Sequence, residues 1–180
     1  MATTLRPFRD YDEHDVINLY TFSGALPVTK GHMVTITRGW LNTAEQNVRL
    51  GDVGAAYANT VSERYGVDAH VGICTASTTP LGMMLYDTKE TDENGEKLIF
   101  NPRKAIEMEV CVSGQAVPVL TRGVLLYSGT VLTTETPAAG TALYSDANGE
   151  ISTGTAAGGQ VGSALGAKDS NNHVLIRLNL

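Results

Sequence analysis

The chain has 180 residues, a length that suits one domain, and 42% of them are hydrophobic, which excludes general disorder. Its formal net charge of −6 and its pI of about 5.1 argue against direct binding to nucleic acid or to an anionic membrane surface, because such partners need a basic face. The 19 glycines, the abundant threonine and a charged fraction of only 18% favour a β-rich chain with many turns.

Residues 1–31 follow neither the helical nor the strand period, although they are rich in apolar side chains. Gly24, Pro27 and Gly31 interrupt the apolar run, so we expect an extended N-terminal arm. Two interpretations of this arm stay open: it packs along its own domain, or it lies on another subunit. In the second case the side chains expected to make the contacts are Val16, Ile17, Leu19, Tyr20, Phe22 and Leu26.

One clear strand signal and one ambiguous region follow the arm. Residues 32–38, HMVTITR, alternate between two faces and predict a strand. Thr43 followed by Gln46 matches a capping box, which predicts a short helix. Residues 55–66 carry apolar side chains at helical spacing but also fit a strand, so both assignments stay open.

From residue 67 onward, the alternation typical of half-buried strands recurs at intervals of roughly ten residues. Strands are predicted over 69–77, 81–88, 104–114, 123–129 and 173–180. Residues 104–114 alternate most cleanly, with Glu107 and Glu109 facing away from a row of apolar side chains: Ile106, Met108, Val110 and Val112. Such one-sided strands are typical of antiparallel sheets.

These signals predict a mainly β protein, either a small antiparallel β-barrel or a β-sandwich, with an extended N-terminal arm and one or two short helices. We expect the arm over residues 1–31 and the β-rich domain over residues 32–180.

The cysteines and the N-terminus bear on the compartment. Cys74 and Cys111 are isolated and have no CxxC spacing, so two free thiols are favoured, while a disulfide between them stays open. The first residues include a cluster of acids and lack the apolar run of a secretory signal. We therefore expect a protein that folds in a reducing cytoplasm.

The stretch TALYSDANGEIST, residues 141–153, has the Asp, Asn and Gly of a small cation-binding loop. An EF-hand loop requires oxygen ligands at its first positions and a glutamate at its last. With Gly149 at the glycine position, the first ligand position holds Tyr144, and the similar loop around Gly95 ends on Asn101. Both loops are therefore predicted to be hairpin turns, in which Asn-Gly permits positive φ and the aspartate caps its own turn.

No other pattern predicts chemistry. None of the four histidines has a second His three or four residues away, no serine lies in a G-x-S-x-G motif, and the glycine-rich stretch 154–162 lacks the lysine of a P-loop. Glu107 and Glu109 are interpreted as the solvated face of a strand rather than as a glycosidase pair. We expect no catalytic residue, no metal and no cofactor, and therefore a protein that is not an enzyme.

Two stretches carry a family resemblance. Residues 140–180 run from a glycine through an apolar stretch with an aromatic, an Asx-Gly hairpin and a glycine-rich loop to a final amphipathic strand. This pattern resembles the C-terminal part of the capsid decoration, or cement, proteins of tailed bacteriophages. Residues 80–123 are similar to head proteins of short-tailed phages.

The resemblance implies a structural virion protein without catalytic residues. Such a protein binds the outer surface of the phage capsid and stabilises contacts between major capsid protein subunits. The resemblance also implies a homo-oligomer, with a homotrimer favoured, that is made in the host cytoplasm and located on the capsid exterior. The apolar arm residues named above are then candidates for capsid contacts. The alternative, of a different class, is a carbohydrate-binding or host-attachment module displayed on the virion.

Overall fold

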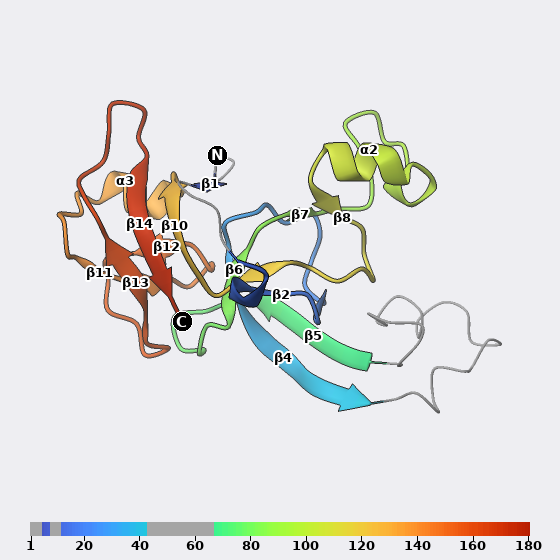
Figure 1. Ribbon diagram of the computed structural model, residues 1–180, viewed down its shortest axis with the longest axis horizontal. Helices are drawn as coiled ribbons and strands as arrows, with labels where there is room; N and C mark the ends of the chain where they lie inside the picture. Colours follow the sequence, from blue (N-terminus) through green and yellow to red (C-terminus); the bar gives the residue numbers. More distant parts are fainter. Residues whose placement is uncertain (1–4, 8–11, 43–66) are drawn as a thin grey trace.

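The computed structural model describes residues 5–7, 12–42 and 67–180. Within these residues the chain forms two six-stranded sheets, a two-stranded sheet and two short α-helices (Figure 1). The prediction of a mainly β fold with short helices is confirmed. The predicted helix at Thr43 and the ambiguous segment 55–66 lie outside the described residues.

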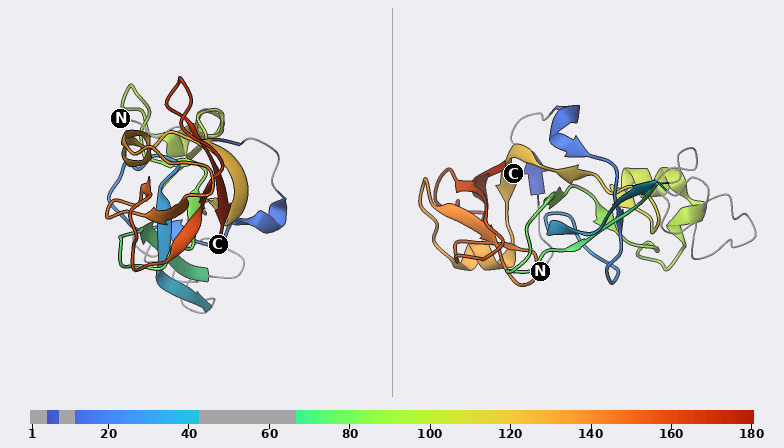
Figure 2. Two further views of the ribbon diagram at one scale, coloured as in Figure 1. Left: turned by 90° about the vertical axis from the view of Figure 1, so that its left-hand side faces the viewer. Right: turned by 90° about the horizontal axis from the view of Figure 1, so that it is seen from below.

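Sheet A is fully antiparallel and curls into a half-barrel, seen end-on in the left view of Figure 2. In spatial order its strands are β1 (Leu5–Pro7), β10 (Arg122–Tyr127), β14 (Val174–Asn179), β13 (Gln160–Ala164), β11 (Ala142–Ser145) and β12 (Ile151–Ser152). The predicted final strand is confirmed as β14: Val174, Ile176 and Leu178 are buried, while Arg177 is exposed. Helix α3 (Thr130–Thr134) follows β10.

Sheet B contains the longest strand pair of the described chain. Its spatial order is β2 (Val16–Ile17), β9 (Val119–Leu120), β6 (Gly82–Met84), β4 (Met33–Asn42), β5 (Val67–Ile73) and β3 (Thr21–Phe22). Neighbours are antiparallel except β3 and β5, which run parallel. The strand predicted over 32–38 is confirmed and extends further as β4, where a register shift between Ile36 and Arg38 adds to the twist.

The described part of the predicted arm contributes a strand to sheet A and two strands to sheet B. Strand β1 pairs with β10, β2 pairs with β9, and β3 pairs with β5, while the 3-10 helix η1 (Glu13–Asp15) precedes β2. In the single chain these residues therefore pack along their own domain. A contact with another subunit, and the boundary between residues 31 and 32, stay predictions.

The strand predicted over residues 104–114 is wrong for most of its length. Helix α2 (Pro102–Glu107) occupies its first part, and strand β8 (Val110–Cys111) follows and pairs in parallel with β7 (Asp87–Thr88). Pro102 favours a helix start because its fixed φ and missing N–H suit the first helical turn. The positive φ of 52° at Glu109 then separates helix from strand.

This correction changes the surface of the segment. Ile106 is 75% exposed instead of sharing a buried face with Val110 and Val112. Glu107 and Glu109 lie on different elements rather than on one strand face. The predicted strand over 81–88 is also divided, into β6 and β7, with the 3-10 helix η3 (Leu98–Phe100) completing the elements before α2.

Three hairpin turns share one hydrogen-bonding scheme: Asp92–Glu96, Asp146–Glu150 and Asp169–His173. In each, the aspartate Oδ1 accepts hydrogen bonds from the backbone N–H groups two and four residues later, at 2.7–2.9 Å. The fourth residue of each turn has positive φ: Gly95, Gly149 and Asn172. The prediction that the two Asn-Gly loops are turns capped by their own aspartates is confirmed.

The turn Asp146–Glu150 also joins the two sheets. The Gly149 carbonyl accepts a hydrogen bond of 2.7 Å from the N–H of Met33, at the start of β4. The Glu150 carboxylate accepts one of 2.9 Å from the N–H of Val131 in helix α3. The Ile151 N–H, next along the chain, donates to the buried Tyr127 hydroxyl at 3.2 Å. Burial raises the pKa of Tyr127 well above its ordinary value, so the phenol stays neutral.

A shared hydrophobic core reinforces this joint. One cluster of buried side chains takes Met33, Cys74, Met83, Leu85 and Leu120 from the side of sheet B, and Leu125, Tyr127, Leu143, Val161 and Ile176 from sheet A. The glycine-rich stretch 154–162 makes a second tie, because the Gly158 N–H donates to the Ala76 carbonyl at 3.1 Å. Alanine at Gly158 would place its Cβ 2.0 Å from the Thr78 carbonyl oxygen.

We expect Gly149→Ala to lower the free energy of unfolding more than Gly95→Ala. Both glycines have positive φ, which costs an alanine about 1–2 kcal/mol. A Cβ at Gly95 meets nothing within 4 Å, whereas a Cβ at Gly149 would lie 2.7 Å from Ile73 Cγ2 and 2.9 Å from the Met33 carbonyl oxygen. Overpacking there adds about 1–3 kcal/mol. Urea unfolding of both variants measures the difference, and equal losses would show that the turn does not hold the sheets together.

Candidate interaction surfaces

Within the described residues, no group of three or more His, Cys, Asp or Glu side chains is placed to hold a metal ion. The carboxylate of Asp92, in the better of the two candidate cation loops, accepts backbone hydrogen bonds with Oδ1 and an ion pair from Lys104 with Oδ2. Across the described ranges no helix has the length and apolar character needed to cross a membrane.

The cysteines behave as buried thiols. Cys74 and Cys111 are free and buried, so the favoured prediction of two unpaired thiols is confirmed. Burial raises the pKa of Cys111 to about 11, which keeps this thiol protonated and weakly nucleophilic at neutral pH. The Cys74 Sγ lies 3.1 Å from the Thr78 hydroxyl, inside the segment that also contacts Gly158.

The predicted contact residues of the arm lie mainly against the chain's own cores. Tyr20 and Phe22 are buried, at 8% and 7% exposure, in the core beneath sheet B. Ile17, Leu19 and Leu26 are half-buried against this same core, and Val16 is half-buried against the core shared by the two sheets. The structure thus brings five of these six side chains to one cluster. Their contact with a capsid or another subunit stays a prediction.

Leu26 reaches the surface in a concavity of about 460 Å³. Leu26 and Pro27 form one side of it, and residues 89–93 form the other. The backbone of Val28 bonds in both directions with Thr88, and the Lys30 N–H donates to the Asp87 carboxylate at 2.9 Å. The end of the arm is therefore fastened to the base of the segment that follows β7.

That segment, residues 89–109, forms a small projection that we call the α2 lobe; it contains η3 and α2 and stands beside sheet B (Figure 1). A small core packs Leu98, Ala105 and Met108 of the lobe against Val110 and Val112, which follow it in the chain. The outer surface of the lobe carries three large apolar side chains that are mostly exposed: Ile99 at 62%, Phe100 at 79% and Ile106 at 75%.

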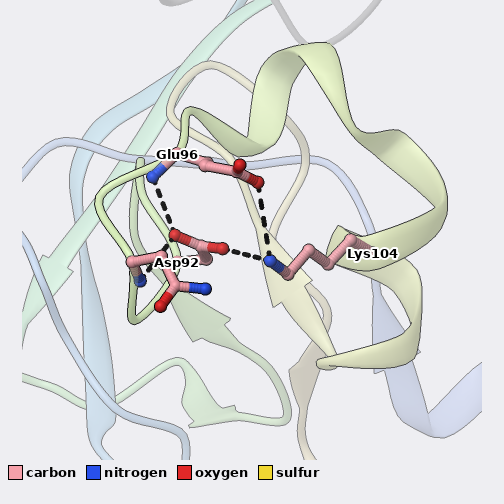
Figure 3. Close-up of polar contacts among 4 residues, drawn as sticks. Asp92, Glu96 and Lys104 are labelled. Atoms are coloured by element: carbon pink, nitrogen blue, oxygen red, sulfur yellow. Dashed lines mark hydrogen bonds and ion pairs between the residues drawn. The ribbon is translucent and has the colours of Figure 1, made fainter.

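An ion pair between a buried carboxylate and a partly exposed ammonium fixes helix α2 to the first turn of the lobe (Figure 3). The Asp92 side chain is 1% exposed, and its carboxylate binds the Lys104 ammonium, which also lies 3.7 Å from Glu96. The hydrogen bond from Lys104 holds the pKa of Asp92 below its ordinary value, with the N–H groups of Glu96 and Asn94 acting in the same direction. The hydrogen bond to Asp92 correspondingly raises the pKa of Lys104.

A second surface lies on the outer face of sheet A. A shallow concavity of about 330 Å³ crosses strands β13 and β14 and is lined by Gln160, Gly162, Ser163, Arg177 and Asn179. Gly162 lets the strands approach there, since a Cβ would lie 2.1 Å from the Arg177 carbonyl oxygen. The lining is polar, which suits hydrogen-bonded or charged contacts with a partner rather than apolar burial.

The sequence does not predict the α2 lobe. Ile106 falls on the dry face of the strand predicted over residues 104–114, and no element is predicted over residues 98–100, so the exposure of these apolar side chains is not expected. The Asn101-Pro102 dipeptide was the available signal, because proline is favoured at the first position of a helix. The residues LIF at 98–100 gave no indication of which side chains face outward.

We expect Asp92→Asn to lower the unfolding midpoint at neutral pH, since the amide cannot pair with the Lys104 ammonium. The folded-state pKa of Asp92 is depressed, so its contribution is complete above the ordinary aspartate value of about 3.9 and is lost as the pH falls through the folded-state pKa. The gap between variant and wild type should therefore close in acid. Thermal unfolding between pH 7 and pH 2.5 tests this, with Glu96→Gln as the exposed control. A gap that is independent of pH would contradict it.

Comparison with known proteins bears on the C-terminal part of the chain. No curated protein and no solved structure matches it. A family model does match part of it, and the matched residues contain strands β8 to β14, which include every strand of sheet A except β1. Residues 108–180 thus match the phage cement protein family, a family of structural, non-enzymatic proteins that associate with and stabilise the virion capsid, and the predicted resemblance is confirmed over these residues.

Proposed function

We propose that this protein binds the outer surface of a tailed-phage capsid and stabilises contacts between neighbouring major capsid protein subunits. The observation that carries the proposal is that the cement-family match covers five of the six strands of sheet A, which pack on the core that they share with sheet B. The net charge of −6 supports an outer location, because packaged DNA would repel an acidic protein.

To stabilise a shell, a protein needs only to bind the assembled shell more tightly than the separate subunits. A protein that binds the assembled lattice and not the separate subunits stabilises the lattice by mass action. A typical specific interface buries about 1,600 Å² in total, and several such contacts in one oligomer gain strength through effective concentration. We propose a homo-oligomer for this reason, and favour a homotrimer because the family resemblance implies one. It would be made in the host cytoplasm and would attach to the capsid exterior.

The arm over residues 1–31 is part of this proposal. Most of the predicted contact residues face the chain's own cores, but Leu26 lines an open concavity next to the α2 lobe. We propose that a capsid subunit covers Leu26 when the protein docks. The apolar side chain would then lose its remaining contact with water.

Shells that carry this protein should resist heat better than shells that lack it. The expected result is a disruption temperature several degrees higher when purified protein is added back, measured by light scattering during heating. In the same preparation, the protein should co-sediment with assembled shells and not with dissociated capsid subunits. If shells with the protein bound and shells without it disrupt at the same temperature, the stabilising role is contradicted.

Leu26→Ser should weaken binding to shells severalfold, whereas Val28→Ser should not. Both residues are half-buried against the same core, so the two variants lose similar packing, but Val28 is not a predicted contact residue. Co-sedimentation over a range of protein concentrations compares the two dissociation constants. Equal affinities of the two variants for the shell would argue against a capsid contact at Leu26.

A further inference from the structure

We propose that the apolar tip of the α2 lobe, formed by Ile99, Phe100 and Ile106, docks into an apolar pocket on a major capsid subunit. This inference rests on the proposed function and names a surface that the cement-family match does not include, since the lobe tip precedes residue 108. The partner's chemistry is set by the three side chains, which offer hydrocarbon and aromatic surface and no hydrogen-bonding group.

The exposure of these residues separates them from the rest of the described surface. Each is at least 62% exposed, whereas the other exposed large hydrophobic side chains reach at most 44% and lie on separate elements: Ile36, Tyr86, Leu165 and Leu180. A contiguous apolar patch on a soluble protein commonly marks an interaction site, while single exposed apolar residues need no explanation. The three residues of the lobe tip lie on η3 and α2, two elements that pack against each other, so their exposed side chains share one end of the lobe.

Local structure holds this patch outward. Leu98 is 1% exposed and Ala105 is 5% exposed, and each directly precedes an exposed apolar residue. The chain therefore buries one side of η3 and α2 in the small core of the lobe and directs the other side to solvent. The exposure therefore belongs to a formed structure, in which Leu98 and Ala105 take the buried positions.

The lobe is also fastened at its base. The Asp92–Lys104 ion pair links the first turn to helix α2, and Lys30 of the arm forms an ion pair with Glu109 where the helix ends (Figure 3 shows the first of these). A surface that is already ordered loses less conformational entropy when it binds. Arg103 and Glu107, which pair at 3.0 Å on the exposed side of α2, give the patch the polar rim common around apolar interface centres.

The small size of the patch favours a capsid subunit over a second copy of this chain. A stable pairwise interface needs about 800 Å² from each partner. Three side chains fall well short of that, since even an aromatic residue buries only about 150–250 Å². Such a patch is effective as one contact among several, where the other contacts hold it at high effective concentration.

The position of the lobe supports the same choice. Sheet A and the α2 lobe lie toward opposite ends of the long axis of the molecule (Figures 1 and 2). A molecule with one capsid contact on sheet A and another on the lobe tip is able to bridge two neighbouring subunits. A self-association site on the lobe would leave this second end without a capsid contact.

The test is a double variant, Phe100→Ser with Ile106→Ser, compared with a matched control, Ile36→Ser with Leu165→Ser. The control residues are the next most exposed large hydrophobics, at 44% and 42%. Affinity for shells that lack the protein is measured by co-sedimentation. We expect the lobe variant to bind at least tenfold more weakly and the control to stay within threefold of wild type, with unchanged unfolding midpoints for both. If the double variant unfolds, Phe100→Ala serves in its place, with a loss of at least threefold expected.

The outcomes separate this inference from the function on which it rests. If wild type binds shells and the folded lobe variant binds equally well, the inference is overturned and the proposed function stands. Failure of wild type to bind shells overturns both. If wild type self-associates in free solution and the lobe variant does not, measured by sedimentation velocity, the occupant is a second copy and the inference is again overturned.

Discussion

The docking of one hairpin turn onto the start of a strand holds the two large sheets in place. The turn Asp146–Glu150 presents the Gly149 carbonyl to the N–H of Met33, while its last residue binds helix α3 through Val131. Gly149 makes this possible in two ways: it adopts the positive φ that closes the hairpin, and it has no side chain to collide with β4 and β5. The sheets then share one core.

The same turn chemistry occurs in three settings, two of which are the loops whose sequences resemble a calcium-binding loop. In each turn one aspartate oxygen accepts hydrogen bonds from two backbone N–H groups. At Asp92 the remaining oxygen pairs with Lys104, and at Asp169 the hydrogen bond from the N–H of His173 is the main reason for its lowered pKa. A carboxylate oxygen that accepts these bonds stabilises its own turn.

How much could be predicted from the sequence depended on how local each signal is. Strand β14 and the capped turns follow from alternation and Asx-Gly chemistry within a few residues, and the structure confirms them. The parallel pairing of β3 with β5 depends on contacts far apart in the chain, which leave no mark in a single sequence. The strand prediction over helix α2 was wrong for a different reason. Over six residues, a period of two and a period of 3.6 place many of the same side chains on one face, so Pro102 was the deciding signal. The apolar lobe tip was missed with it, since hydrophobicity alone does not say which face is covered.

The proposed bridging role requires a rigid molecule. Bridging two subunits resists their separation only if the bridge itself does not bend, so the hydrogen bonds that fix sheet A to sheet B would carry load between the proposed contacts. Two such bonds join the Met33 N–H to the Gly149 carbonyl and the Gly158 N–H to the Ala76 carbonyl, while the Asp92–Lys104 pair fixes helix α2 within the lobe. Under the proposed function, loss of the joint would weaken shell stabilisation even with both contact surfaces intact, because two well-bound ends on a flexible connection allow the subunits to move apart.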